Sequence, residues 1–262
     1  MENLTIMMKH TKITDLNSIV KTDRFQKSFQ NLKNARSEIN SECTKVYKEY
    51  VDGDDLFALH LAGGSLRDLF FGYKPSDIDI FITCNNPEIM SYRYKLCLSY
   101  VIKTTKLTPS TSDSKFGAVQ SVINKPDSNI QLIICQNKYT EEFSDFSNNK
   151  TFPERSSETK FKPEKFNFGI NRIWYNHNED KLEWTEEFEK DLVDGTSTLY
   201  LDDEHDSGFS MAKSLSKWNK WKENNRNYGK LKFCKKLLEK PEMFKFPDNF
   251  KEHTIYHEMY MS

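Results

Sequence analysis

Two acidic residues, Asp77 and Asp79, stand one residue apart with no basic residue between them. The alternating pattern IDIFI at 78–82 predicts a strand, and side chains two residues apart on a strand point to the same side. Carboxylates held side by side repel each other unless a cation lies between them. Mg²⁺ prefers such oxygen ligands, so the pair predicts a Mg²⁺ site, with Mn²⁺ as the alternative ion.

A double glycine precedes the two carboxylates in the chain. Gly63 and Gly64 follow the apolar run 56–62, which suits a buried strand, and Ser65 opens the segment after them. A glycine turn lets the backbone approach a ligand closely, and N–H groups at a helix start attract phosphate. A phosphate site that faces a metal pair is what nucleotidyl transfer by two metal ions requires.

The stretch GGSLRDLFFGYKPSDID, residues 63–79, resembles the signature of a known family. This family comprises the class II tRNA nucleotidyltransferases and bacterial poly(A) polymerases, which are polymerase-β-like nucleotidyltransferases. Weaker similarities extend the resemblance over roughly 56–202 and lie at 116–119, 129–134, 166–176 and 191–201. The resemblance implies an α+β fold: a head domain with a mixed sheet flanked by helices, followed by a short helical appendage.

The resemblance also implies roles for individual residues. Asp77 and Asp79 correspond to the catalytic metal ligands, and Arg67 corresponds to a group near the substrate or triphosphate that Asp68 orients. Outside this motif, an Arg-Asp pair is often only a structural ion pair. The nucleotide-binding residues that the resemblance implies are Gly63, Gly64, Ser65, Arg67, Asp68, Lys165 and Asn171.

The sequence departs from the family's pattern in three places. Gln131 stands where the fold usually has a third acidic residue, and Lys165-Phe166-Asn167 stands where the family has Arg-Arg-Asp. No segment matches the Glu-Asp-x-x-Arg motif with which the tRNA enzymes select C and A. The first departure bears on catalytic strength, and the third bears on specificity for CCA.

Composition restricts the class of protein. The chain has 262 residues, 37% of them hydrophobic, and a net charge of −1, so any contact with RNA must use a local patch. Its five cysteines form no C-x-x-C motif and are expected to be reduced. No apolar run has membrane length, which predicts a cytoplasmic protein, in the host cytoplasm if the gene belongs to a phage. The oligomeric state stays open.

Hydrophobic periodicity predicts the elements around the motif. The pattern indicates an amphipathic helix over 23–50, two strands at 56–62 and 78–83 joined by a short helix, and a second helix over 87–104. It further indicates a hairpin of strands 116–123 and 129–135, and a polar loop over 137–162.

The charge of the chain changes sign near residue 207. Residues 176–206 are strongly acidic and residues 211–240 strongly basic, which predicts a head domain at 1–206 and a basic appendage at 207–262. Lysines that alternate with aromatic residues can bind an RNA backbone and stack its bases. The alternative is a solvated basic helix whose tryptophans pack on the head. The candidate RNA-binding residues are Lys213, Lys217, Trp218, Lys220, Trp221 and Lys222.

These observations together predict a template-independent nucleotidyltransferase. It would transfer NMP from an NTP, ATP or CTP first, to an RNA or tRNA 3′ end. Two alternatives stay open: an enzyme that modifies a protein or small molecule in the manner of toxin-type nucleotidyltransferases, and a degenerate member that binds nucleotide or RNA without turnover. His253 and His257 have the i, i+4 spacing of metal ligands but lack a third ligand, so surface histidines are expected there.

Overall fold

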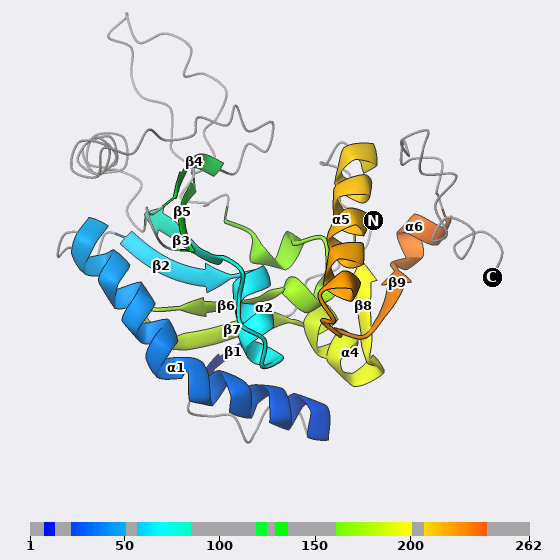
Figure 1. Cartoon of the computed structure of the whole chain (residues 1–262), viewed down its shortest axis with the longest axis horizontal. Helices are drawn as coiled ribbons and strands as arrows, with labels where there is room; N and C mark the ends of the chain where they lie inside the picture. The colour runs from blue at the N-terminus through cyan, green and yellow to red at the C-terminus, as the bar shows by residue number, and fades with distance from the viewer. Residues whose placement is uncertain are drawn as a thin grey trace, which may run out of the picture.

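A computed structural model describes residues 8–13, 22–50, 57–84, 119–124, 129–135, 161–200 and 207–239. Within these residues, seven strands form a mixed sheet in the order β1-β7-β6-β2-β3-β5-β4, and β8 and β9 form a separate pair (Figure 1). Helices flank the large sheet, which confirms the expected α+β class. The strands are β1 Met8–Lys12, β2 Phe57–Ala62, β3 Ile78–Cys84, β4 Val119–Asn124, β5 Ile130–Cys135, β6 Ile173–Asn176, β7 Lys181–Thr185, β8 Thr196–Leu199 and β9 Lys230–Phe233.

The long helix α1 (Asp23–Tyr50) has the bounds that its periodicity predicted. Its apolar side chains recur every three or four residues and therefore form one stripe. That stripe is buried in the main core and includes Phe25, Phe29, Leu32, Ile39 and Val46. The prediction succeeded because charged residues separate the apolar ones throughout the helix.

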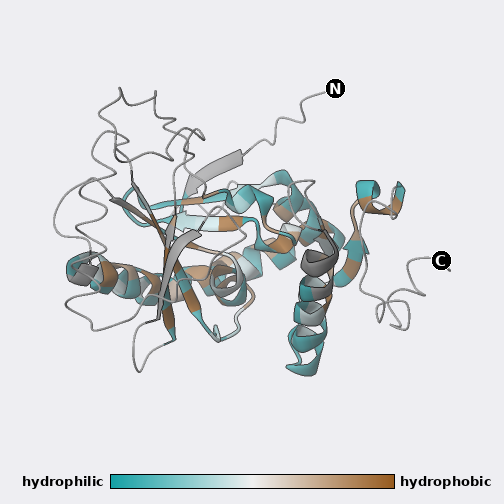
Figure 2. Cartoon of the chain, turned by 90° about the horizontal axis from the view of Figure 1, so that it is seen from above, coloured by the Kyte–Doolittle hydropathy of each residue, from teal (hydrophilic) through white to brown (hydrophobic). Residues whose placement is uncertain are grey.

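One face of the central sheet forms the core. Leu59 and Leu61 of β2 and Ile80 of β3 are almost fully buried and belong to the same hydrophobic cluster as α1 and the short helix α2 (Gly64–Phe70). Brown stretches, which are hydrophobic, are visible in several strands in Figure 2. Because side chains alternate along a strand, Asp79 and Phe81 point to the opposite face.

The predicted hairpin is present as β4 and β5, which pair antiparallel. β5 also pairs with β3, and this is the parallel contact of the large sheet. The predicted strands at 56–62 and 78–83 correspond to β2 and β3, which pair antiparallel. The expected strand, glycine turn, helix and strand therefore occur in the predicted order.

The C-terminal elements pack on the same core. They are α4 (Glu186–Asp194), α5 (Ser207–Glu223) and α6 (Lys235–Glu239), and Met211, Trp218 and Leu237 join the main hydrophobic cluster. β9 pairs in parallel with β8, so α5 connects two neighbouring strands. The basic segment 211–240 therefore contains most of α5 and the whole of α6, as a helical appendage predicts, but also the strand β9, which the sequence analysis did not predict.

Some predictions lie outside the described residues. These are the helix at 87–104, the greater part of the loop at 137–162, the boundary at 206, and the two histidines, His253 and His257. In the parts of the chain listed above, no helix combines the length and the apolar character needed to cross a membrane.

Candidate active site

The two carboxylates lie at the start of β3. Asp77 precedes the strand and is exposed, and its Oδ1 accepts a 3.0 Å hydrogen bond from the hydroxyl of Ser76. Asp79 is half-buried, and within the described residues its buried Oδ1 has no hydrogen-bond donor. Burial, followed by repulsion from Asp77, raises the pKa of Asp79 to about 6, whereas Lys217 acts in the opposite direction. The site therefore concentrates negative charge that its own hydrogen bonds do not neutralise.

Gln131 lies beside this pair. In the parallel register of β3 and β5 it is the partner of Asp79, so both side chains belong to the same face of the sheet. The sequence predicted that Gln131 takes the place of a third acidic residue, and the register agrees with that position. Among the described residues, no group of three or more His, Cys, Asp or Glu side chains could hold a metal ion.

Aromatic rings cover the same face next to Asp79. The ring of Phe81 lies 4.9 Å from that of Phe161 and 6.0 Å from that of Phe166. His60, the register partner of Phe81, stacks on Phe161 at 4.7 Å, and burial lowers its pKa to about 4. His60 is therefore neutral at pH 7 and is part of an apolar wall rather than a proton donor.

The glycine turn lies against this wall. Gly63 has a φ of +72°, which residues other than glycine rarely adopt. A Cβ at this position would lie 3.3 Å from the ring of Phe166. The predicted need for glycine thus has a geometric cause. Ser65, which was expected at the phosphates, is buried, and its hydroxyl donates to the carbonyl of Ala62 at 3.2 Å. Its side chain stabilises the turn.

Arg67 is a buried structural group. Its guanidinium is 4% exposed and lies between two rings, 4.1 Å from the centroid of Trp221 and 4.2 Å from that of Tyr228. It donates to Asp68 Oδ1 through Nε at 3.0 Å and to Asn171 Oδ1 through a terminal nitrogen at 2.9 Å. The predicted orientation of Arg67 by Asp68 is therefore observed, and Asn171 is a second partner of the same guanidinium. The roles of these three residues at a nucleotide stay predictions.

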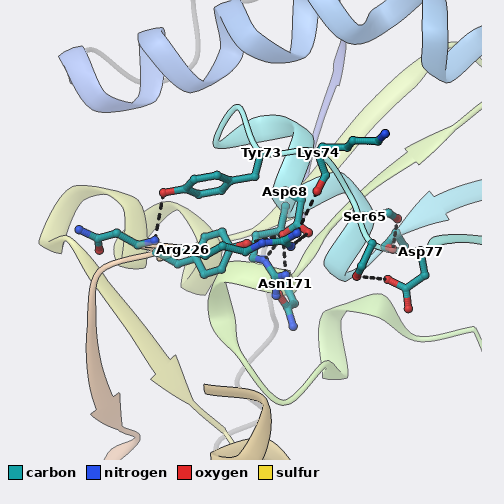
Figure 3. A network of polar contacts seen from close by, with 12 residues as sticks. Ser65, Asp68, Tyr73, Lys74, Asp77, Asn171 and Arg226 are labelled. Atoms are coloured by element: carbon teal, nitrogen blue, oxygen red, sulfur yellow. Dashed lines mark hydrogen bonds and ion pairs between the residues drawn. The ribbon is translucent and has the colours of Figure 1, made fainter. Parts of the chain in front are cut away.

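Asp68 is the centre of this network (Figure 3). Besides Arg67, its carboxylate accepts hydrogen bonds from the guanidinium of Arg226 and the hydroxyl of Tyr228. Arg226 also donates to the carbonyl of Lys74 at 2.9 Å. Sequence analysis missed Arg226 and Tyr228, because no local pattern links them to residues so far away in the chain. The network fixes α2, and hence the glycine turn, to the segment after α5.

The two tryptophans of α5 do not form an RNA-binding surface. Trp218 and Trp221 are 4% and 8% exposed, and both rings pack near Phe168, at 6.5 and 4.9 Å between centroids. The hypothesis that they stack RNA bases is therefore wrong for this conformation, and the alternative that they pack on the head is confirmed. Aromatic area removed from water stabilises the fold instead.

The lysines of α5 remain on the surface. Lys213, Lys217, Lys220 and Lys222 are all exposed. Lys165 ends the 3₁₀ helix η2 (Pro163–Lys165), directly before Phe166 of the aromatic wall, and is half-buried. These positions are compatible with contacts to phosphate groups.

The residues present fit one kind of metal site. Mg²⁺ is commonly bound through one or two protein carboxylates and completes its octahedron with substrate phosphates and water. Asp77 and Asp79 supply this number of carboxylates, and the buried oxygen of Asp79 without a donor is a free ligand atom. A small cavity lined by Ile39, Cys43 and Ile80 lies on the opposite face of the sheet and is not part of this site.

Comparisons with known proteins gave matches among solved structures. Neither the protein-family models nor the curated proteins searched match the sequence. A Thermotoga maritima CCA-adding enzyme complexed with tRNA is 16% identical over 80% of this chain, with a TM-score of 0.37. An apo CCA-adding enzyme is 15% identical over 89%, with a TM-score of 0.46, and a CCA-adding enzyme with ATP is 16% identical over 80%, with a TM-score of 0.41. The chain covers 40%, 46% and 40% of these three chains, respectively, which is less than half of each.

Proposed function

We propose that this protein is a template-independent nucleotidyltransferase. It transfers NMP from an NTP to an acceptor hydroxyl, which we assign to an RNA 3′ end: the hydroxyl oxygen bonds to the α-phosphorus, the bond to the β-phosphate breaks, and pyrophosphate and a proton are released. One observation carries the proposal: Asp79 has a buried carboxylate oxygen that no donor of the described residues reaches, and repulsion from the carboxylate of Asp77 acts on it. Desolvated like charges of this kind call for a divalent cation. The resemblance of residues 63–79 to a nucleotidyltransferase signature supports the same reaction.

The chain's own residues divide the work in this proposal. Asp77, which is exposed, and Asp79, which is half-buried, would hold the metal at the start of β3. When bound, Mg²⁺ supplies charge stabilisation at the α-phosphate and at the attacking oxygen. The backbone at Gly63, which has no side chain and a positive φ, approaches the β- and γ-phosphates. The half-buried aromatic wall of Phe81, Phe161 and Phe166 limits the access of water beside the metal.

The exposed lysines of α5 are the proposed path for an RNA acceptor. They belong to a helix whose tryptophans pack against the ring of Phe168 and over Arg67, so the helix is held close to the site. Phosphate contacts from lysine carry no sequence information but position a strand. We propose no preference for tRNA over other RNAs, because the sequence has no match to the Glu-Asp-x-x-Arg motif that selects C and A.

Gln131 favours a second candidate function. An amide opposite Asp79 adds no negative charge to the metal site, and a protein with only two carboxylates there can bind Mg²⁺ and nucleotide without turnover. This candidate predicts nucleotide binding with no product. The two candidates therefore differ in chemistry but share the binding site.

One labelling experiment separates these functions. The protein is incubated with each α-labelled NTP, Mg²⁺, and either total RNA or cell lysate, and labelled RNA is then separated from labelled protein. We expect label in RNA. Label in protein or in a small molecule would show that the acceptor is not RNA. Nucleotide that binds without any transfer would establish the second candidate function. Asp77→Asn and Asp79→Asn serve as matched controls, and label that persists in both would exclude this site as the catalytic one.

A further inference from the structure

Lys217 occupies an unusual place on α5. The buried stripe of this helix consists of Met211, Ser214, Leu215, Trp218 and Trp221. Lys217 lies three residues after Ser214 and four residues before Trp221, so it neighbours both on the helix surface. Its side chain is nevertheless exposed. The helix therefore places Lys217 at the edge of the stripe that faces the head domain.

The two neighbours of Lys217 are anchored to elements of the candidate site. The hydroxyl of Ser214 accepts a 2.9 Å hydrogen bond from the side-chain amide of Asn167, which follows Phe166 of the aromatic wall. The ring of Trp221 lies over Arg67, whose guanidinium nitrogen would be 3.6 Å from a Cβ at Gly64. Lys217 thus lies on the helix between a contact to the aromatic wall and a contact to the glycine-turn helix.

The charges around Lys217 agree with this placement. Burial of the ammonium group, followed by repulsion from Lys213 and Arg67, lowers the pKa of Lys217, whereas attraction to Asp79 and Asp77 acts in the opposite direction. Lys217 therefore lies within electrostatic range of both carboxylates. Within the described part of the chain, no carboxylate comes within ion-pair distance of Lys217. The arginines nearby are engaged differently, because Arg67 and Arg226 both bind Asp68. Lys217 is consequently a cation within electrostatic range of Asp77 and Asp79 that has no ion-pair partner among the described residues.

We propose that Lys217 binds the triphosphate of the incoming NTP, opposite the Mg²⁺ held by Asp77 and Asp79. The inference rests on the proposed function and assigns one of its substrate contacts to α5. A compact ammonium group suits a triphosphate, because it acts as a point charge toward several oxygens. Lys217 would make the triphosphate contact that was expected of Arg67. Arg67 itself is buried and bound to Asp68.

Lys230 provides a control outside the candidate site. It is also exposed, and it begins β9, which pairs with β8 and is not part of the large sheet that carries Asp77 and Asp79. A charge removed at Lys230 changes the net charge of the protein as much as one removed at Lys217, but it leaves α5 unchanged.

Calorimetric titration with inorganic tripolyphosphate tests this assignment without turnover. In Mg²⁺, Lys217→Gln should weaken tripolyphosphate binding about tenfold or more, because a charge-assisted contact is lost. Lys230→Gln should leave it within about twofold. With Mg²⁺ alone the sign should reverse: Lys217→Gln should tighten Mg²⁺ binding, because a cation that repels the metal has been removed. A general structural defect would weaken both ligands.

Three results would overturn the assignment. Equal tripolyphosphate affinity in wild type and Lys217→Gln would remove Lys217 from the phosphate site and leave the proposed function intact. A salt slope of RNA binding that falls in Lys217→Gln, with tripolyphosphate affinity unchanged, would make Lys217 part of the acceptor path instead. Wild-type protein that binds neither Mg²⁺ nor tripolyphosphate would remove the proposed function itself, and the assignment with it.

Discussion

Gln131 of β5 stands directly opposite Asp79 of β3 in the parallel register of the central sheet. The amide lies on the same face as the carboxylate, so its length and charge bear directly on the candidate metal site. A neutral partner limits the negative charge available to a divalent ion. The affinity of the site for Mg²⁺ should therefore change when the amide of Gln131 is replaced by a carboxylate of the same length.

Gln131→Glu should tighten Mg²⁺ binding, on the order of tenfold, because ligand charge sets the affinity of such sites. Without metal the same change should lower the free energy of unfolding, since a third carboxylate joins two that already repel each other. Calorimetry with Mg²⁺ measures the first effect and urea denaturation in EDTA the second. Gln131→Asn is the uncharged control, and weaker Mg²⁺ binding in the Glu variant would show that position 131 does not face the metal.

Asp79→Asn should change how stability depends on pH. The pKa of Asp79 rises from 3.8 in the unfolded chain to about 6 in the fold, so the folded state disfavours its charge. This cost is absent below about pH 4, grows through pH 6 and is complete above it, at most about 3 kcal/mol. In EDTA, Asp79→Asn should therefore match wild type at pH 4 and be more stable at pH 7. Urea denaturation across this range measures the difference, and a constant difference would contradict the burial of the charge.

Trp218→Ala and Trp221→Ala should each destabilise the protein by roughly 3–5 kcal/mol, because both rings are buried against other aromatic rings. RNA affinity per folded molecule should stay the same.

Reversal of Lys213, Lys220 and Lys222 to Glu should have the opposite profile, with stability kept and the salt slope of RNA binding reduced by about one unit per lost phosphate contact. Thermal melts and RNA titrations at several salt concentrations measure both quantities.

Asp68→Ala should cost roughly 3–5 kcal/mol, because it leaves the buried guanidinium of Arg67 and a second arginine without their carboxylate. Tyr228→Phe removes one hydrogen bond to the same carboxylate and should cost only about 1–2 kcal/mol. Chemical denaturation compares the two variants. Equal losses in both would mean that the ring packing of Tyr228, rather than the charge network, stabilises this region.

Local sequence patterns predicted the parts of the fold whose signal is periodic or chemical. The stripe of α1 and the alternation in β3 each carry their own period, and both elements appear where they were expected. The glycine at position 63 was predicted from its type, and its positive φ gives the physical reason. The position of Gln131 in place of a third acidic residue was implied by the resemblance to the nucleotidyltransferase family, not by a local pattern.

The remaining features depend on contacts that no short window contains. β6 is buried at all four positions, so it has no alternation to detect. The apolar residues Met211, Leu215, Trp218 and Trp221 do recur at helical spacing in α5, and this signal could have indicated burial, but the lysines between them suggested a nucleic-acid surface. The pairing of Asp68 with Arg226 depends on tertiary structure alone.

The Asp68 network also has a consequence for the order in which the protein folds during synthesis. Its hydrogen bonds to Arg226 and Tyr228 join residues 158 and 160 positions apart. On the ribosome, α2 is made before these partners, so Asp68 lacks Arg226 and Tyr228 until both have left the exit tunnel. Contacts of such large sequence separation form slowly, because closing the loop costs entropy first. We expect the candidate site to reach its final geometry only after residue 228 has left the ribosome. Assembly of the site is therefore a late step in the folding of the nascent chain.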